Sequence, residues 1–267
     1  MSLQFPYINP VALAIGPLTI HWYALAYITG ILGGFLLIKK QLLILCAKNT
    51  EKTIDFLLTI SLSILLGGRI GYSIFYSPLY FINNPFDVIK LWEGGMSFHG
   101  GILGCLIGTW IFCKKNKYNL WKCLDLLALV APIGIGLGRI GNFINAELYG
   151  RVTNLPWGII FPTGGPLPRH PSQLYEAGLE GVLLGICMFI LLKYKKHSLK
   201  PGMLACIFSS LYSLFRFFIE FFREPDFHIG LLYFKLSLGQ YLCIIMLCLS
   251  MGVYYYLSKN KLLKKNN

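Results

Sequence analysis

The sequence contains few charged residues. Only 13% of its 267 residues are charged, while 55% are apolar, and the mean hydropathy is +0.61. A soluble domain of this length carries about 25% charged residues. The composition therefore excludes a soluble globular domain and indicates a chain that crosses a membrane several times.

Cysteine pairs with redox or metal-ligand spacing are also missing. The eight cysteines form no Cys-x-x-Cys pair, and none lies in a lysine-poor connection. This distribution predicts small apolar packing residues, and we expect neither disulfides nor a metal site. No basic segment precedes the first apolar run, which we therefore expect to remain a helix. No internal repeat is visible, which favours a single domain over residues 1–267 and argues against a repeat-built transporter.

Lysines and arginines occupy different parts of the chain. Sixteen of the eighteen lysines follow alternate apolar runs, and no arginine lies among them. Lysine on alternate loops is typical of a chain inserted with those loops in the cytoplasm. Because this pattern accounts for the net charge of +13, we predict no binding to nucleic acid. The six arginines are expected in the membrane or on its far side: Arg69, Arg139, Arg151, Arg169, Arg216 and Arg223.

Seven apolar runs are long enough to cross roughly 30 Å of hydrocarbon as helices. They cover about residues 17–38, 54–77, 97–113, 120–138, 177–193, 203–222 and 237–257. An odd number of spans places the termini on opposite sides, and the lysines put the N-terminus outside and the C-terminus in the cytoplasm. We predict an all-α polytopic membrane protein with about seven transmembrane helices. Two lysine-poor connections, residues 78–96 and 139–176, are long enough to form a small extracytoplasmic cap.

Several charged side chains fall inside the predicted spans. A charge at the centre of a membrane helix costs at least about 2.5–3.5 kcal/mol, so each one needs a partner. Arg69 has no acidic neighbour in its own span, and we expect its partner on another helix or in a bound anion. In the sixth span, spacings of four, four and three put Tyr212, Arg216, Glu220 and Arg223 on one helix face. An Arg216–Glu220 pair that only locks two helices together is an equally open interpretation.

Two polar segments stand at the ends of apolar runs. His99 lies between two glycine pairs, and a histidine with its ordinary pKa of about 6.5 suits proton removal at neutral pH. A packing role for this lone histidine stays open. Residues 138–151 combine Arg139 with Asn142, Asn145 and Glu147. Arginine grips phosphate through two parallel bonds and asparagine adds neutral donors, although the segment could also be a hydrogen-bonded loop that ends a helix.

Six blocks of sequence together resemble the prolipoprotein diacylglyceryl transferases, bacterial membrane enzymes that lipidate lipoprotein precursors. The blocks are HWYALAY, GGRIGY, WEGGMSFHGG, GRIGNFINAELYGR, RHPSQLYEA and RFFIEFFREPD, in this order. The resemblance runs from about residue 13 to residue 240, and Gln240 fits the last block of the family. The following Cys243-Ile-Ile-Met246 departs from the Ser-x-Pro-Met-like end of the family, which leaves the bend of the seventh helix undefined.

The resemblance implies a bacterial inner-membrane enzyme without a cofactor, with its active site on the extracytoplasmic side. The implied reaction moves the diacylglyceryl group of phosphatidylglycerol to the lipobox cysteine of a prolipoprotein signal peptide, which gives a thioether and glycerol phosphate. This is the first step of lipoprotein maturation, and membrane lipids are the expected surroundings. A membrane transporter or binding protein for a small anion or a phospholipid head group is the alternative, since it would also place arginines in helices.

The resemblance also implies roles for particular residues. Arg139 and Arg216 are the expected phosphate-binding pair, and His99 is either the base or a structural anchor. Glu220 and Arg223 are expected to hold Arg216 or to gate the pocket. The remaining residues expected to bind substrate are Tyr23, Arg69, Asn142, Asn145, Glu147, Gly150 and Tyr212.

Overall fold

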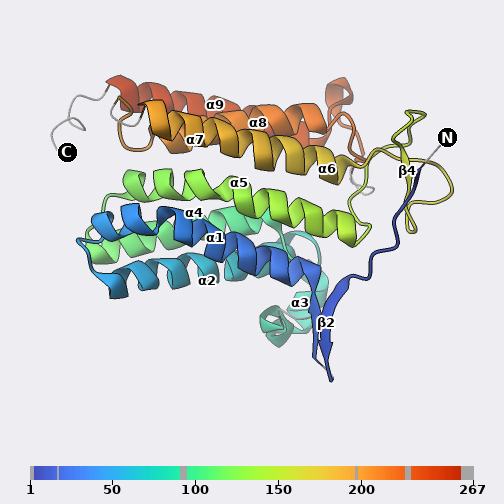
Figure 1. Ribbon diagram of the computed structural model, residues 1–267, viewed down its shortest axis with the longest axis horizontal. Coiled ribbons are helices and arrows are strands. Elements are labelled where there is room, and N and C mark those ends of the chain that lie inside the picture. The colour runs from blue at the N-terminus through green and yellow to red at the C-terminus, as the bar shows by residue number, and fades with distance from the viewer. Residues whose placement is uncertain (1–2, 17, 91–94, 196–197, 226–229, 260–267) are drawn as a thin grey trace. The chain divides into compact units, whose positions relative to one another are not determined.

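A computed structural model describes residues 3–16, 18–90, 95–195, 198–225 and 230–259. The chain is mainly helical (Figure 1). It divides into two compact units, one formed by Met1–Leu37 with Leu127–Asn267 and the other by Ile38–Leu126. We call them the larger and the smaller unit.

Within the described part of the chain, five helices are long and apolar enough to cross a membrane. They are α1 (Trp22–Leu45), α2 (Thr50–Phe75), α5 (Leu120–Ile144), the continuous helix Ser172–Tyr194 and α9 (Leu238–Lys259). A shorter apolar helix, α8 (Met203–Ile219), matches the sixth predicted span. α4 (Phe98–Asn116) matches the third predicted span in position, but it is not among the five because a histidine, four glycines and two lysines interrupt its apolar residues. The protein is a polytopic, multi-pass membrane protein.

The predicted spans differ from the helices by five or more residues at four ends, and two of these ends carry the candidate site. α5 continues to Ile144, whereas the predicted span stopped at residue 138. The fifth span begins at Ser172 instead of 177 and consists of α6 (Ser172–Glu176), the π-helix η3 (Ala177–Leu183) and α7 (Leu184–Lys195). A span predicted from hydropathy stops at the first charged residue, but a helix continues through charges that are paired inside the protein. The first helix begins at Trp22 instead of 17, because Leu18–His21 forms strand β3, and it ends at Leu45 instead of 38.

In the smaller unit, α2 and α4 pack backbone against backbone. A Cβ atom added to Gly104 would overlap the carbonyl oxygen of Ser63, and one added to Gly100 would overlap that of Gly67. The glycines of α4 therefore let the two helices approach closely, because these residues carry no side chains.

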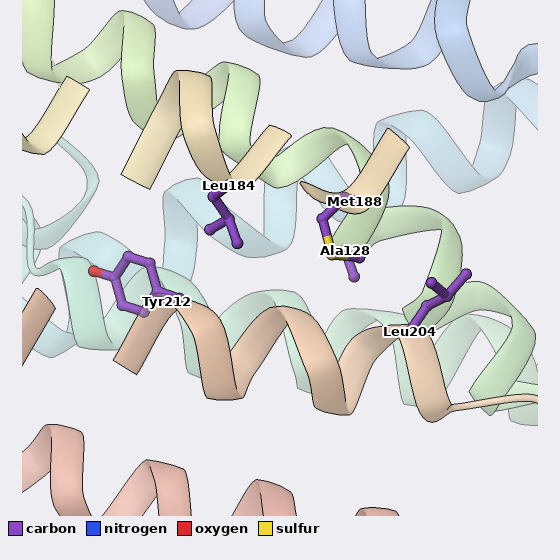
Figure 2. Close-up of a cluster of buried hydrophobic side chains, with 5 residues drawn as sticks. All are labelled: Ala128, Leu184, Met188, Leu204 and Tyr212. Atoms are coloured by element: carbon purple, nitrogen blue, oxygen red, sulfur yellow. The ribbon is translucent and has the colours of Figure 1, made fainter. Parts of the chain in front are cut away.

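The core of the larger unit joins three helices that run alongside the candidate site. Ala128 of α5, Leu184 and Met188 of α7, and Leu204 and Tyr212 of α8 form one buried cluster (Figure 2). The Tyr212 hydroxyl points away from the other four labelled side chains. In Figure 1, α9 runs beside α8 and packs against it. This apolar packing holds α5, α7 and α8 in register.

The connection between α5 and α6 is an ordered cap. Its strand β4 (Ile159–Ile160) pairs in parallel with β1 (Leu3–Gln4). Phe161, which is 1% exposed, packs against Phe5, Phe143 and Tyr149. Because the first six and last five residues of the predicted loop 139–176 are helical, the cap proper is shorter than predicted.

Other short elements flank the helices. β2 (Val11–Ile15) and β3 form an antiparallel hairpin ahead of α1. The predicted cap loop 78–96 contains α3 (Pro78–Asn83) and the 3₁₀-helix η1 (Pro85–Ile89), and its residues 91–94 lie outside the described part. A further 3₁₀ turn, η4 (Tyr233–Lys235), precedes α9.

Candidate active site

A cluster of six ionisable side chains lies inside the larger unit, and we call it the ionic network. The two glutamates of the Ser172–Tyr194 helix are fully buried and Glu220 is 6% exposed. Each of the three arginine side chains is at most 14% exposed. The network consists of Arg139 from α5, Glu176 at the end of α6, Glu180 in η3, Arg216 from α8, and Glu220 and Arg223 just beyond α8.

Two glycines bring the network together. A Cβ atom added to Gly181 of η3 would lie 2.7 Å from the Cα atom of Gly136 in α5, so the two backbones are in contact. Arg139 follows Gly136 by three residues, and Glu180 directly precedes Gly181. Both side chains therefore project beside the point where the helices touch. The π-helical geometry of η3 is rare and is frequently found at functional sites.

Glu176 is the hub of the network. Its Oε2 atom lies 2.7 Å from Nε of Arg139 and 2.9 Å from Nη1 of Arg216. Its Oε1 atom accepts a hydrogen bond of 3.1 Å from Nη1 of Arg223. One buried carboxylate thus binds three arginines, which come from α5, from α8 and from the segment that follows α8.

Glu220 connects the network to the start of α9. Its Oε2 atom lies 2.9 Å from Nη2 of Arg216, which confirms the predicted pair. Its Oε1 atom accepts a hydrogen bond of 3.0 Å from the Ser237 hydroxyl. Ser237 and Gln240 cap α9 reciprocally, because each side chain accepts the backbone N–H of the other, at 3.2 Å and 3.0 Å. The first turn of α9 therefore fixes the far side of Arg216.

Arg223 departs from the predicted arrangement on a single helix face. α8 ends at Ile219, and Arg223 lies beyond it in a β-bridge with Gly150. A Cβ atom at Gly150 would overlap the carbonyl oxygen of Phe222 and lie 2.7 Å from Cβ of His170. Glycine at position 150 is therefore what lets the cap close onto this segment.

The amides predicted for a head-group pocket meet at Glu147. Asn142 and Asn145 donate to its Oε1 atom at 2.8 Å and 3.3 Å, and Gln173 donates to its backbone carbonyl at 2.6 Å. The Asn145 and Gln173 side-chain oxygens are buried without a hydrogen-bond partner among the described residues. Tyr23 of α1 packs on the same stretch of α5, because a Cβ atom at Gly141 would lie 2.7 Å from its ring.

An apolar pocket of about 480 Å³ borders η3. It is lined by Leu155, Trp157, His170, Tyr175, Gly178, Leu179, Phe218, Ile219 and Phe222. The Trp157 indole donates to the Tyr175 hydroxyl at 2.8 Å. Burial lowers the pKa of the His170 imidazole, which favours its neutral form in these surroundings.

Arg69 belongs to the smaller unit, where backbone carbonyl oxygens of η1 and of Gly95 bind its guanidinium. Its guanidinium donates to the carbonyl oxygens of Asp87, Val88 and Gly95 at 2.8 Å, 3.2 Å and 3.3 Å, and it lies 5.2 Å from the centroid of the Phe81 ring. Arg69 therefore fastens the segment after α3 to α2. The Asp87 carboxylate accepts from Lys90 and Tyr80, which lowers its pKa.

His99 also belongs to the smaller unit. It is exposed in the first turn of α4, and Ser97 caps this helix by accepting the Gly100 N–H at 3.2 Å. The structure therefore brings together Arg139, Arg216, Glu220 and Arg223, and places Tyr23 and the amides on adjoining elements of the larger unit.

Comparison with known proteins extends the resemblance seen in the sequence. The sequence model described as "Prolipoprotein diacylglyceryl transferase" matches residues 10–256. The chain belongs to the prolipoprotein diacylglyceryl transferase family. The phosphatidylglycerol–prolipoprotein diacylglyceryl transferase of Oleidesulfovibrio alaskensis is 47% identical over 263 residues, which is 97% of each chain. Those of Rickettsia felis and Desulfotalea psychrophila are 46% and 44% identical, over 92% and 94% of this chain and 96% and 94% of theirs.

The carboxylates that bind the arginines of the ionic network were not predicted from the sequence of this prolipoprotein diacylglyceryl transferase family member. Glu176 lies in the block RHPSQLYEA, but the sequence predicts no contact with arginine for it, nor for Glu180 or Ser237. The sequence did contain a signal, since two glutamates four residues apart with glycines at 178 and 181 interrupt an otherwise apolar run. Acids at this spacing share a helix face, and an acidic face within a membrane span requires cations opposite it.

Proposed function

We propose that this chain transfers the diacylglyceryl group of phosphatidylglycerol to the lipobox cysteine thiol of a prolipoprotein signal peptide, and that the ionic network holds the phosphate. Family membership makes the chain a diacylglyceryl transferase. The observation that supports the site is the convergence of the Arg139 and Arg216 guanidinium groups, from α5 and α8, on one buried carboxylate.

The reaction needs both a phosphate site and a base. The cysteine sulfur forms a bond to the glycerol carbon of the lipid, the bond from that carbon to the phosphate oxygen breaks, and glycerol phosphate leaves with the electron pair. The thiol proton must be removed, because the thiolate is the nucleophile. Arginines fixed in a low-dielectric site stabilise the charge that develops on the leaving phosphate. In our proposal Asn142, Asn145 and Glu147 contact the glycerol head group.

A direct assay tests the proposed reaction. Purified protein with phosphatidylglycerol and a lipobox peptide is expected to add a diacylglyceryl group to the peptide thiol without added metal or nucleotide. Mass spectrometry would detect the mass gain on the peptide. A folded protein that binds phosphatidylglycerol but leaves both lipid and peptide unchanged would favour the alternative, a transporter or binding protein.

The orientation in the membrane is part of the proposal. We propose a bacterial inner-membrane protein of seven spans with its N-terminus and cap outside and its lysine-rich connections in the cytoplasm. We also propose a single membrane domain, because α1 and α5 each run without interruption from one compact unit into the other.

Labelling with an impermeant thiol reagent tests this orientation once the native cysteines are removed. A cysteine introduced at Asn116, the last residue of α4, is expected to react only after the membrane is opened. A cysteine at Thr163 in the cap is expected to react in intact cells. The reverse pattern would refute the orientation.

His99 is proposed as the base, and a structural anchor is the competing role. If the imidazole removes the thiol proton, His99→Gln is expected to fold and bind lipid while turnover collapses. Raising the pH toward the thiol pKa of about 8.5 would then restore part of the activity, because thiolate forms without a base. Turnover against pH, with thermal unfolding followed in parallel, measures this. A folded variant with nearly full activity and an unchanged pH profile would remove His99 from the chemistry.

A further inference from the structure

The two buried glutamates of the ionic network have unequal surroundings. Glu176 lies within 3.1 Å of three arginines. Glu180, one turn further along the same helix, is 3.6 Å from Nη1 of Arg216 and 3.7 Å from Nη2 of Arg139. Neither carboxylate oxygen of Glu180 has a hydrogen bond among the described residues, although the side chain is 0% exposed. A fully buried carboxylate without hydrogen bonds is the group of the network whose ionised form is least stabilised.

The charges of the network balance before any substrate is bound. With every group ionised, three positive charges of arginine meet three negative charges of glutamate, so the sum is zero. The phosphodiester of phosphatidylglycerol carries one further negative charge. Adding it to a neutral, buried site leaves one negative charge without compensation, which is strongly unfavourable in a low-dielectric interior.

One added proton would restore the balance, and the contacts identify where it goes. The groups that face Glu180 are Arg139 from α5, Glu176 from its own helix, Tyr212 and Arg216 from α8, and Arg223 from the segment after α8. Glu176 and Glu220 each lie 2.9 Å from a guanidinium nitrogen of Arg216, so protonating either one would weaken a short ion pair. Protonating Glu180 weakens no contact shorter than 3.6 Å.

We propose that Glu180 carries a proton whenever Arg139 and Arg216 hold the lipid phosphate, so that binding of phosphatidylglycerol takes up one proton. This inference rests on the proposed function, which places the phosphate at these two arginines. With Glu180 neutral, three arginines face two ionised glutamates, so the network has one net positive charge to bind an anionic ligand. A carboxylic acid also donates a hydrogen bond that a carboxylate lacks.

The sign of the pH dependence follows from this linkage. Where Glu180 is ionised in the free protein, binding must protonate it, so the affinity for phosphatidylglycerol falls as the pH rises. The dissociation constant then increases by up to about tenfold per pH unit. Glutamine at position 180 is permanently neutral and nearly the same shape. Glu180→Gln is therefore expected to keep tight binding at high pH and to lose this slope.

Calorimetric titration of the purified protein with phosphatidylglycerol tests the proposal. Titrations in buffers of different ionisation enthalpy, from pH 5.5 to 8.5, give the number of protons taken up. We expect about one proton in the wild-type protein at the pH where Glu180 is ionised, and none in Glu180→Gln. Glu224→Gln removes an equally charged but 49% exposed carboxylate and is expected to behave like the wild type. Diacylglycerol, which has no phosphate, is expected to bind without proton uptake.

Two results would overturn the inference. One is the absence of proton uptake by the wild-type protein throughout the pH range. This result would overturn the inference even if Glu180→Gln does not fold. The other is a folded Glu180→Gln that still takes up one proton. Binding by Arg139→Lys and Arg216→Lys shows whether only the proton uptake by Glu180 is refuted, or also the proposed phosphate site. If both bind phosphatidylglycerol like the wild type, the phosphate is elsewhere. If both bind it weakly while wild-type proton uptake is zero, only the role of Glu180 is refuted.

Discussion

Glu176→Gln is expected to lower the free energy of unfolding by about 3–5 kcal/mol, the cost of breaking a buried ion pair from one side. Glu176 is fully buried and contacts Arg139, Arg216 and Arg223 at 2.7 Å, 2.9 Å and 3.1 Å. Glutamine keeps the shape but removes the charge, so three guanidinium groups would face two remaining carboxylates. Thermal or denaturant-induced unfolding in detergent, monitored by circular dichroism, measures the loss.

The matched control for this change lies in the segment that follows α8. Glu224 pairs with Arg169 at 2.8 Å, but its side chain is 49% exposed. An exposed ion pair contributes about 0–1 kcal/mol, because water solvates both partners once they separate. Glu224→Gln is therefore expected to leave stability nearly unchanged. Equal unfolding curves for both variants would mean that the network does not hold the helices together.

The positions of the helices could be predicted from the sequence, but several ends could not. Long apolar runs specify membrane helices because every backbone polar group must be satisfied within the segment. The same reasoning failed at Arg139, where the predicted span stopped and α5 continues to Ile144. Hydropathy treats each charge as if it faced lipid, whereas Glu176 and Glu180 neutralise Arg139 across a contact between helices. Such compensation depends on which helices are neighbours.

The chemistry of the site was only partly predictable for the same reason. Arginine, asparagine and tyrosine in the quoted blocks indicated where phosphate and head group would be held. The role of Glu180 depends on the π-helix η3 and on the Gly136–Gly181 contact, and no local pattern specifies a π-helix. The short parallel pair of β1 and β4 was not predicted, because each strand has only two residues and they are far apart in sequence.

Arg139→Lys and Arg216→Lys are each expected to reduce kcat/KM at least tenfold, which is about 1.4 kcal/mol of transition-state stabilisation. Each guanidinium uses different nitrogens for different carboxylates. Arg139 reaches Glu176 with Nε and Glu180 with Nη2, and Arg216 reaches Glu176 with Nη1 and Glu220 with Nη2. A lysine has one ammonium group, so it cannot hold two carboxylates in this geometry and also present two parallel bonds to a phosphate. Steady-state transfer of diacylglycerol to a lipobox peptide measures the effect.

Arg151→Lys is the matched control for these two variants. It makes the same chemical change at a position where only one guanidinium nitrogen is used. Arg151 lies in the cap, and its Nε atom donates one hydrogen bond of 2.9 Å to the Arg223 carbonyl oxygen. A lysine ammonium can donate to a single carbonyl, so a smaller loss of turnover is expected. A selective loss in Arg139→Lys and Arg216→Lys, in protein that unfolds at the wild-type temperature, would separate phosphate recognition from structural support. Near-normal turnover in both would instead make the two arginines counter-ions of Glu176, and the phosphate would then have to be held by other groups.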